Sequence, residues 1–161
     1  MNDYIEVKVL TLLFDNVNQT PVLLLKEKEG SRILPIWIGI FEAQSILMAL
    51  KGIMLHRPLT HDLCLDIINS FGGKLINVNI SKLDKGTFYA ELILTHKRNK
   101  IVIDARPSDS IALALRYSVP IFVNSTVLDI ASIPDDQHLD EKQWEDILKN
   151  IPDEAFGKYS M

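Results

Sequence analysis

The chain has 161 residues, of which 47% are hydrophobic and 24% charged, values ordinary for one soluble globular domain. Its formal net charge of −4 argues against a surface that attracts nucleic acid everywhere, but it leaves room for a local basic site. Cys64 is the only cysteine, which excludes an intramolecular disulfide and a cysteine-based zinc cluster. The apolar runs are too short to span a membrane and the first residues lack a signal-peptide pattern, so we expect a cytoplasmic protein without membrane contact.

The acidic charge lies in the C-terminal part of the chain. Residues 1–125 carry 14 basic and 12 acidic side chains, a net of +2, whereas residues 126–161 carry three lysines against nine acids, a net of −6. Such a segment is typical of a solvated helix packed at the edge of a domain, or of an acidic flap that competes with an anionic ligand. We therefore divide the chain into a domain over residues 1–130 and an acidic, helical C-terminal extension over residues 131–161.

The first half of the chain predicts three strands followed by two helices. Alternating or continuous apolar residues on short connections favour an antiparallel meander of three strands, at residues 4–15, 21–28 and 32–38. From residue 40 the apolar side chains recur at spacings of three and four, which is a helical period. A second helix follows Pro58, with the Gly72-Gly73 pair as its stop signal.

The second half of the chain repeats this order. Three strands are predicted at residues 74–83, 87–95 and 101–105. Pro107 then opens a helix, a short strand follows at residues 120–123, and a last helix is predicted over residues 140–150.

The two halves also resemble each other in sequence. Residues 45–50 (SILMAL) align with residues 110–115 (SIALAL) at an offset of 65 residues, although short apolar runs also match by chance. The order of elements predicts an α+β fold: a mostly antiparallel sheet with helices packed on it, plus a C-terminal helix. A duplicated β-β-β-α unit would account for this order. If the duplication holds, the strand-to-helix junctions near Gly39 and near Asp104 are equivalent and face one another.

Polar side chains gather at the second of these junctions. Asp104 and Arg106 share a parity at the end of a predicted strand, and Pro107, Ser108 and Asp109 are typical of a helix start. Two carboxylates and an arginine beside a helix N-terminus can bind a phosphate, or a metal ion that in turn binds one. The same residues also suit a plain helix cap, in which Arg106 pairs with Asp104 or Asp109.

Two further helix starts carry polar residues. Thr60 is the expected N-cap of the second helix, which places His61 and Asp62 in its first turn. A neutral imidazole there can act as a general base or a metal ligand, although a structural histidine is the more common case. Glu42 lies in the first turn of the helix after Gly39, where an acid also simply complements the helix dipole. The sequence contains no P-loop, zincin or nucleophile-elbow motif.

Four blocks of sequence stand at these junctions: LPIWIGIFEA (residues 34–43), RPLTHDL (57–63), TFYA (87–90) and IDARPSDSIALA (103–114). Together they resemble the bifunctional nuclease family, small bacterial and plant domains assigned DNase and RNase activity. The similarity spans roughly residues 5–130 in the expected order and spacing. Ser110 stands where we expect alanine in this family.

The resemblance implies an α+β fold and nuclease activity on both DNA and RNA. It does not by itself imply a mechanism. We hypothesise metal-assisted hydrolysis of phosphodiester bonds, in which a divalent cation, Mg²⁺ or Mn²⁺, is held by Asp104, Asp109 and Glu42.

Other residues of these junctions would act on the substrate. His61 would activate water, with Asp104, Arg106 and Asp109 as its catalytic partners. Arg106 and Arg57 would stabilise charge on the phosphate, and Thr60 would contribute to substrate binding beside Arg57. The expected partner is therefore a nucleic acid, DNA or RNA.

The alternative is a non-catalytic binding or regulatory module. The same polar residues would then cap helices and hold the two halves together, and the domain would bind its partner without cutting it. The net charge of −4 and the lack of an aromatic-basic cluster in the sequence favour this alternative. A homo-oligomer, most simply a two-fold dimer, is the expected assembly, with Trp37, Phe88 and Tyr89 as residues that could pack between subunits.

Overall fold

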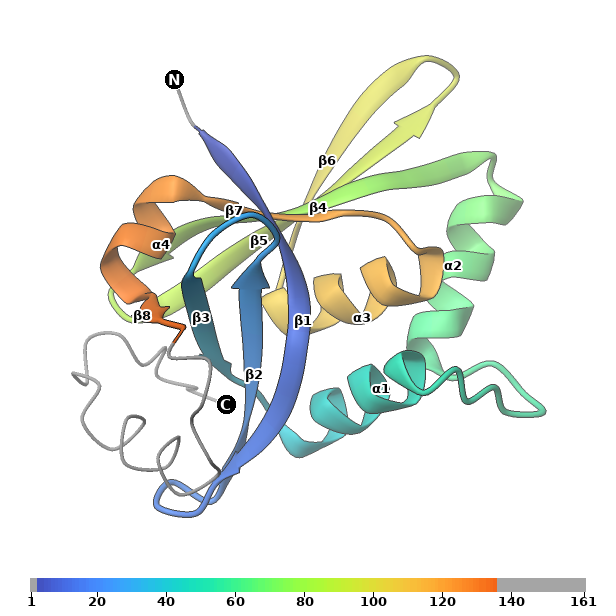
Figure 1. The fold of residues 1–161 in the computed structure, drawn as a ribbon. Coiled ribbons are helices and arrows are strands. Elements are labelled where there is room, and N and C mark those ends of the chain that lie inside the picture. The colour runs from blue at the N-terminus through green and yellow to red at the C-terminus, as the bar shows by residue number, and fades with distance from the viewer. Residues whose placement is uncertain (1–2, 136–161) are drawn as a thin grey trace.

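The computed structural model describes residues 3–135, which form an α+β fold with one eight-stranded sheet and four helices (Figure 1). The elements follow in the order β1 (Tyr4–Asp15), β2 (Thr20–Glu27), β3 (Arg32–Trp37), α1 (Ile40–Leu50), α2 (Thr60–Ser70), β4 (Gly73–Asp84), β5 (Thr87–His96), β6 (Asn99–Ala105), α3 (Pro107–Tyr117), β7 (Ile121–Asn124), α4 (Ser125–Ala131) and β8 (Ile133–Pro134).

Two β-β-β-α units make up most of this fold, as the sequence predicted. β1, β2 and β3 lead into α1, whereas β4, β5 and β6 lead into α3, and α2 lies between the two units. The two unit helices, α1 and α3, have 11 residues each. The strands and helices predicted up to residue 123 are all present, with small differences at their ends.

A single strand joins the two units into one sheet. The order across the sheet is β6-β5-β4-β7-β1-β2-β3-β8, so each three-stranded meander lies on one side of β7. Ile121 of β7 is opposite Val78 of β4 in a parallel pair and opposite Val7 of β1 in an antiparallel pair. The other neighbouring strands are antiparallel, which confirms the mostly antiparallel sheet.

Helices α1, α2 and α3 gather on one side of the sheet, where α3 contacts both other helices and also β4 and β5 (Figure 1). Pro107 fits the first position of α3 because a helix leaves that N–H unpaired in any case. Arg106 before it adopts the extended conformation (φ −72°, ψ 145°) that a following proline favours. Ile46 of α1 and Ile111 of α3 are fully buried in the core between helices and sheet.

β2 is buried on both faces, which explains its uninterrupted apolar run. Its leucines at positions 23 and 25 belong to the main core, whereas Val22 and Leu24 pack in a second, smaller cluster with Trp37. The indole Nε1 of Trp37 donates a hydrogen bond to Asp15 Oδ2 at 2.9 Å.

Two of the aromatic residues expected between subunits are interior residues. Trp37 is 5% exposed and Phe88 is 8% exposed, so neither side chain can reach a second copy. The prediction is wrong for both, because alternation in a strand does not show which of two buried faces a side chain enters. Tyr89, on the opposite face of β5, is exposed.

The sequence did not predict α4 and β8. α4 is a short helix whose N-cap Asn124 accepts a hydrogen bond from the backbone N–H of Thr126 at 2.9 Å. β8 adds two residues to the sheet edge, with Pro134 opposite Arg32 of β3. The helix predicted at residues 140–150, and with it most of the acidic extension, lies outside the described residues. Within residues 3–135, no helix is long and apolar enough to cross a membrane.

Candidate functional site

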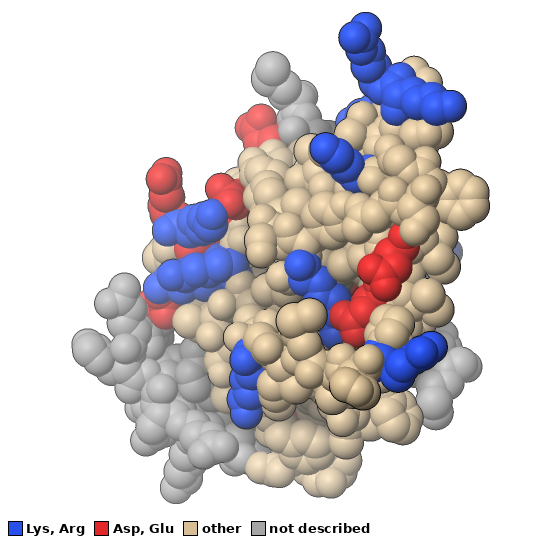
Figure 2. Space-filling model, turned by 90° about the vertical axis from the view of Figure 1, so that its right-hand side faces the viewer, with Lys and Arg blue, Asp and Glu red and all other residues tan. Residues whose placement is uncertain are grey.

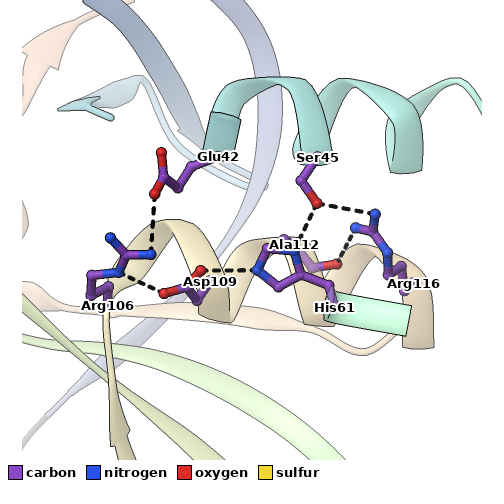
Figure 3. Close-up of polar contacts among 7 residues, drawn as sticks. All are labelled: Glu42, Ser45, His61, Arg106, Asp109, Ala112 and Arg116. Carbon is purple, nitrogen blue, oxygen red and sulfur yellow. Dashed lines mark hydrogen bonds and ion pairs between the residues drawn. The ribbon is translucent and has the colours of Figure 1, made fainter. Parts of the chain in front are cut away.

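The beginnings of α1 and α3 meet on one side of the molecule (Figure 3). Arg106, the residue before α3, has its Nη2 atom 3.1 Å from Oε1 of Glu42 in the first turn of α1. Its Nε donates to Oδ2 of Asp109 in the first turn of α3 at 2.6 Å. The two strand-to-helix junctions therefore face one another, as the duplicated unit predicts.

Asp109 connects this pair to the start of α2. Its Oδ1 lies 2.9 Å from His61 Nε2, and the other ring nitrogen, Nδ1, lies 2.8 Å from Ser45 Oγ (Figure 3). An ionised carboxylate can only accept, so Nε2 carries the hydrogen that it donates to Asp109. In the neutral imidazole Nδ1 is then an acceptor, and the Ser45 hydroxyl donates to it. One histidine thus links all three helices in a fixed tautomer.

Arg116, near the end of α3, closes the network on the other side of Ser45. Its guanidinium donates from Nη2 to Ser45 Oγ at 3.1 Å, from Nε to Asp62 Oδ1 at 2.7 Å and from Nη1 to the carbonyl of Ala112 at 3.0 Å. The Arg116 side chain is only 10% exposed. A guanidinium suits this position because its planar fork presents several N–H donors in fixed directions.

Two of the carboxylates of the network, Asp109 and Asp62, are held in their ionised form. The hydrogen bond from His61 lowers the pKa of Asp109 to about 2; burial opposes this shift, and Arg106 adds to it. Burial raises the pKa of Asp62, but hydrogen bonds from Arg116 and from the Leu59 N–H outweigh it and hold that pKa below its ordinary value. Both groups are therefore anions at neutral pH, and each is matched by an arginine.

Exposure increases along the network toward Arg106. The His61 side chain is 15% exposed, that of Asp109 30% and that of Arg106 56%. A phosphate from solvent would therefore meet the Arg106 guanidinium first, with Asp109 and His61 behind it. This gradient gives the site an outer cation and an inner acid–base group.

Four of the residues predicted from the sequence, Glu42, His61, Arg106 and Asp109, are thus brought together. Asp104 has no contact with them among the described residues; it lies on exposed β6, opposite Glu91 of β5. Arg57 and Thr60 are exposed, the one in the segment before α2 and the other at its start, and neither bonds to the network.

Thr60 does not act as the predicted helix cap. Leu59 occupies the N-cap position of α2, and Thr60 is the first helical residue. The carboxylate of Asp62, in the first turn of α2, accepts a hydrogen bond from the N–H of Leu59 at 3.0 Å. An acidic side chain at this position of a helix commonly bonds to the N-cap backbone in this way.

The arrangement does not fit a preformed metal site. Within residues 3–135, no three His, Cys, Asp or Glu side chains lie together in a way that could hold a metal ion. Asp109 is bonded through both oxygens, to His61 and Arg106, and Glu42 is paired with Arg106. A requirement for a divalent cation therefore stays a prediction from the sequence.

A cavity of about 710 Å³ adjoins the buried end of the network. Asp62 and Arg116 form part of its wall, together with residues of the segment between α1 and α2 and of α2 itself. Its volume is in the range of small-molecule sites. Because His61 and Asp62 are consecutive in α2, this cavity and the His61–Asp109 pair lie on neighbouring faces of one helix turn.

Sequence reasoning missed Ser45 and Arg116. Both carry a signal that helical spacing could have shown, because residues three, four or seven apart share a helix face. Ser45 follows Glu42 by three residues, and Arg116 follows Asp109 by seven. Their polar side chains interrupt otherwise apolar helices on the face that meets His61.

Comparisons with known proteins relate this chain to one domain family. The bifunctional nuclease domain matches residues 23–136 of this chain. An uncharacterised protein of Mycobacterium tuberculosis strain H37Rv is 49% identical over 133 residues, which are 81% of this chain and 79% of that protein.

Two plant proteins are more distant relatives. Bifunctional nuclease 2 of Oryza sativa subsp. japonica is 30% identical over 111 residues, which are 66% of this chain and 34% of that protein. Bifunctional nuclease 1 of Arabidopsis thaliana is 28% identical over 109 residues, 65% of this chain and 33% of that protein. The similarity thus covers about a third of each plant protein. Because the domain match covers more than half of the chain and contains the whole polar network, this chain belongs to the bifunctional nuclease domain family.

Proposed function

We propose that this protein hydrolyses phosphodiester bonds of DNA and RNA. The observation that carries the proposal is the connected set Arg106–Asp109–His61, in which one ionised carboxylate orients an imidazole on one side and an exposed guanidinium on the other. An imidazole with one fixed N–H can act as a general base through its other nitrogen. A guanidinium matches the oxygens of a phosphate. The names of the plant relatives point to the same chemistry.

In this geometry the basic atom is Nδ1 of His61, to which the Ser45 hydroxyl donates. A water molecule would lose its proton to Nδ1 by replacing that hydroxyl or by passing the proton through it. The water oxygen then bonds to phosphorus, the bond between phosphorus and the leaving oxygen breaks, and that oxygen takes up the proton that Nδ1 received, directly or through a water molecule. Arg106, with Arg57 from the preceding segment, would offset charge on the phosphate oxygens.

A divalent cation would supply further charge neutralisation at the phosphate. Mg²⁺ is commonly held by one or two carboxylates together with substrate phosphates, so a site that is not preformed can still be completed by substrate. Asp104, Asp109 and Glu42 are the proposed ligands. The steps assigned to His61 and Arg106 do not depend on this cation.

Paired substitutions test the assignment in highly purified protein. We expect His61→Ala and Asp109→Asn each to lower the rate of cleavage of DNA and RNA by about a hundredfold or more, the usual contribution of a general base. His56→Ala is the matched control, because His56 is exposed and forms no hydrogen bond or ion pair with the network among the described residues. Unchanged cleavage in both variants, with folding verified by circular dichroism, would remove the mechanism.

A non-catalytic module is the second candidate, because several bonds of the network also join one helix to another. His61 bridges α1 and α3, and Arg106 bridges α3 and α1, which is what a purely structural clamp would do. Such a module would bind nucleic acid but show no turnover at any enzyme concentration, and His61→Ala would change its stability alone.

Exposed apolar side chains on one side of the molecule support a homo-oligomer as part of either candidate. Figure 2 shows areas without charged side chains between the basic and acidic groups on the side where α2 lies. Exposed apolar residues on α1, α2 and the segment between them include Phe41, Met54 and Ile67, and Met54 is 93% exposed. Burying such a surface in a two-fold dimer would remove it from water. Light scattering on the full chain tests this assembly, and fractionation tests the proposed cytoplasmic location.

A further inference from the structure

Four basic side chains gather at one end of the sheet. Lys97 and Arg98 form the turn between β5 and β6, while Lys74 lies opposite Thr95 of β5 and Thr95 lies opposite Lys100 of β6. Residues directly opposite one another share a face, so the two outer lysines flank one threonine. We call Lys74, Lys97, Arg98 and Lys100 the basic hairpin tip. Figure 2 shows Lys and Arg side chains projecting at the top of the molecule, where Figure 1 places this hairpin.

No carboxylate neutralises the basic hairpin tip within the part of the chain that the structure describes. All four side chains are exposed, and none takes part in an ion pair there. By contrast, six other lysines and arginines of this part of the chain are paired with Asp or Glu. A protein with a net charge of −4 therefore carries a local cluster of basic side chains that have no ion pair among its described residues.

The turn itself is strained, and its strain comes from the two basic residues. His96 pairs with Asn99, so Lys97 and Arg98 are a two-residue loop, and both have positive φ, 47° and 69°. A turn of this kind favours Asn-Gly, because a side chain in the left-handed region costs about 1 kcal/mol or more. The other hairpin turn of β5 has glycine as its second residue: Lys85 (φ 49°) is followed by Gly86 (φ 77°).

The basic hairpin tip is connected to the catalytic network by one strand. β6 runs from Asn99 next to the turn to Ala105, and Arg106 follows directly. Seven residues at about 3.3 Å each place the two ends roughly 23 Å apart. Phosphates on one strand of a B-form duplex follow at about 3.4 Å along the axis, so this distance corresponds to about seven nucleotides.

An exposed aromatic ring lies in the same region. A Cβ added at Gly72 would lie 3.8 Å from the ring of His96, so the chain at residues 71–73 runs beside the hairpin, and Phe71 is 80% exposed. Exposed aromatic and basic residues together are typical of surfaces that bind single strands, where bases stack and phosphates pair with cations. The fold thus brings together the aromatic and basic residues that are dispersed in the sequence.

We propose that the basic hairpin tip binds the phosphate backbone of a nucleic acid strand. The scissile phosphate of that strand lies at Arg106, about 23 Å from the tip. The proposed function supplies the identity of the ligand, whereas the cations, the strain and the spacing come from the hairpin itself. In this role the strained Lys-Arg turn presents two charges that Asn-Gly would not.

The test compares two turns of the same sheet. Lys97→Asn and the matched control Lys85→Asn remove the same charge from the same backbone conformation at opposite ends of β5. The double variant Lys97→Asn/Arg98→Gly gives the complete effect. Affinity for a labelled single strand of about 20 nucleotides is measured by anisotropy across a salt series, and unfolding by denaturant.

We expect the double variant to unfold at higher denaturant, since its turn is relaxed, yet to bind the long strand roughly tenfold more weakly and with a shallower salt dependence. Lys85→Asn should leave binding unchanged. In cleavage assays the double variant should raise KM for the long strand but not for a dinucleotide, which cannot reach from Arg106 to the tip.

Three results would overturn this interface: unchanged affinity in the double variant, an equal loss in Lys85→Asn, or equally tight binding of polyglutamate, which would point to an acidic protein partner. Weaker binding by the double variant in a protein that shows no cleavage at all would leave the interface standing and remove the proposed nuclease function instead.

Discussion

Glu42 and Arg106 come from the two β-β-β-α units of the chain, and their carboxylate and guanidinium meet at 3.1 Å. The contact depends on Gly39, because a Cβ at that position would lie 2.0 Å from Oε2 of Glu42. The residue that ends the first unit's strand-to-helix junction therefore makes room for the carboxylate that contacts the second. This pair sets the charge of the outer part of the site.

Removing the Glu42 charge should strengthen phosphate binding. Glu42→Gln keeps the shape of the side chain but removes one of the carboxylates that oppose Arg106, so a phosphate meets a less neutralised guanidinium. We expect tighter nucleic acid binding at low salt, with a loss of folding stability below about 1 kcal/mol because Arg106 is largely exposed. Isothermal titration with a short oligonucleotide measures the change; weaker binding would show that Glu42 positions Arg106 instead.

Asp109 should make the protein sensitive to acid. Its pKa of about 2 in the folded protein lies below its ordinary value of 3.8, so ionised Asp109 stabilises the fold above about pH 4, and that stability is lost as the pH falls toward 2. The contribution is at most about 2 kcal/mol. Urea unfolding between pH 2 and pH 5 should show a smaller loss in Asp109→Asn than in the wild type. Parallel curves for the two proteins would contradict the shift.

Ser110 offers a stabilising substitution. Its hydroxyl is fully buried in α3 and has no hydrogen-bond partner among the described residues, which costs free energy that a methyl group would not. We expect Ser110→Ala to raise the free energy of unfolding by about 1 kcal/mol. Ser70→Ala is the control, because the Ser70 hydroxyl is exposed and donates to the carbonyl of Asp66. A loss of stability in Ser110→Ala as large as that in Ser70→Ala would show that the Ser110 hydroxyl has a partner.

Metal binding and metal dependence test the hypothesis of metal-assisted hydrolysis. With Asp109 and Glu42 already bonded to Arg106, we expect Mn²⁺ to bind the free protein weakly, at millimolar levels, when measured by calorimetry. A chelator in the cleavage assay then tests the metal-assisted step, since loss of turnover restored by Mg²⁺ or Mn²⁺ supports a site completed by substrate. Micromolar binding to the free protein would show a preformed site.

The acidic end of the chain provides a fifth experiment. Residues 136–161 carry seven acids and three lysines, so their removal takes the net charge from −4 to zero. Truncation after residue 135 keeps β8 and the ion pair of Asp135 with Lys26. If these residues compete with an anionic ligand, nucleic acid affinity at low salt should rise. Unchanged affinity would leave them a packing or solvating role.

Much of the fold could be predicted because its information is local. Alternation in β1, the period change at residue 40 and the proline that opens α3 each act over a few neighbours, and all were confirmed. β8 could not be predicted, since a two-residue strand exists only where Arg32 and Ile33 offer an edge. The order of the strands in the sheet could not be predicted either, because β7 pairs with strands that are far from it in the sequence.

The candidate site was also predicted only where the signal in the sequence is local. Glu42, His61, Arg106 and Asp109 could be named because each stands at a helix start, where a polar residue is conspicuous. Ser45 and Arg116 lie inside helices, where their meaning depends on which face packs against which neighbour. Asp104 shows the opposite case: it stands two residues before Arg106 on exposed β6, at the edge of the sheet, yet it has no hydrogen bond or ion pair with the network among the described residues.

The position of β7 has a consequence for how this chain folds. Its four residues come after α3 in the chain, yet both meanders depend on them. β7 pairs with β1 of the first meander on one side and with β4 of the second meander on the other. During synthesis the first unit is complete by residue 50 but must wait for residues 121–124 before its edge strand is covered. Until then β1 presents unpaired backbone groups to other chains. The two halves of the molecule therefore have the same order of elements but fold as a single unit, because β7 completes the sheet between them.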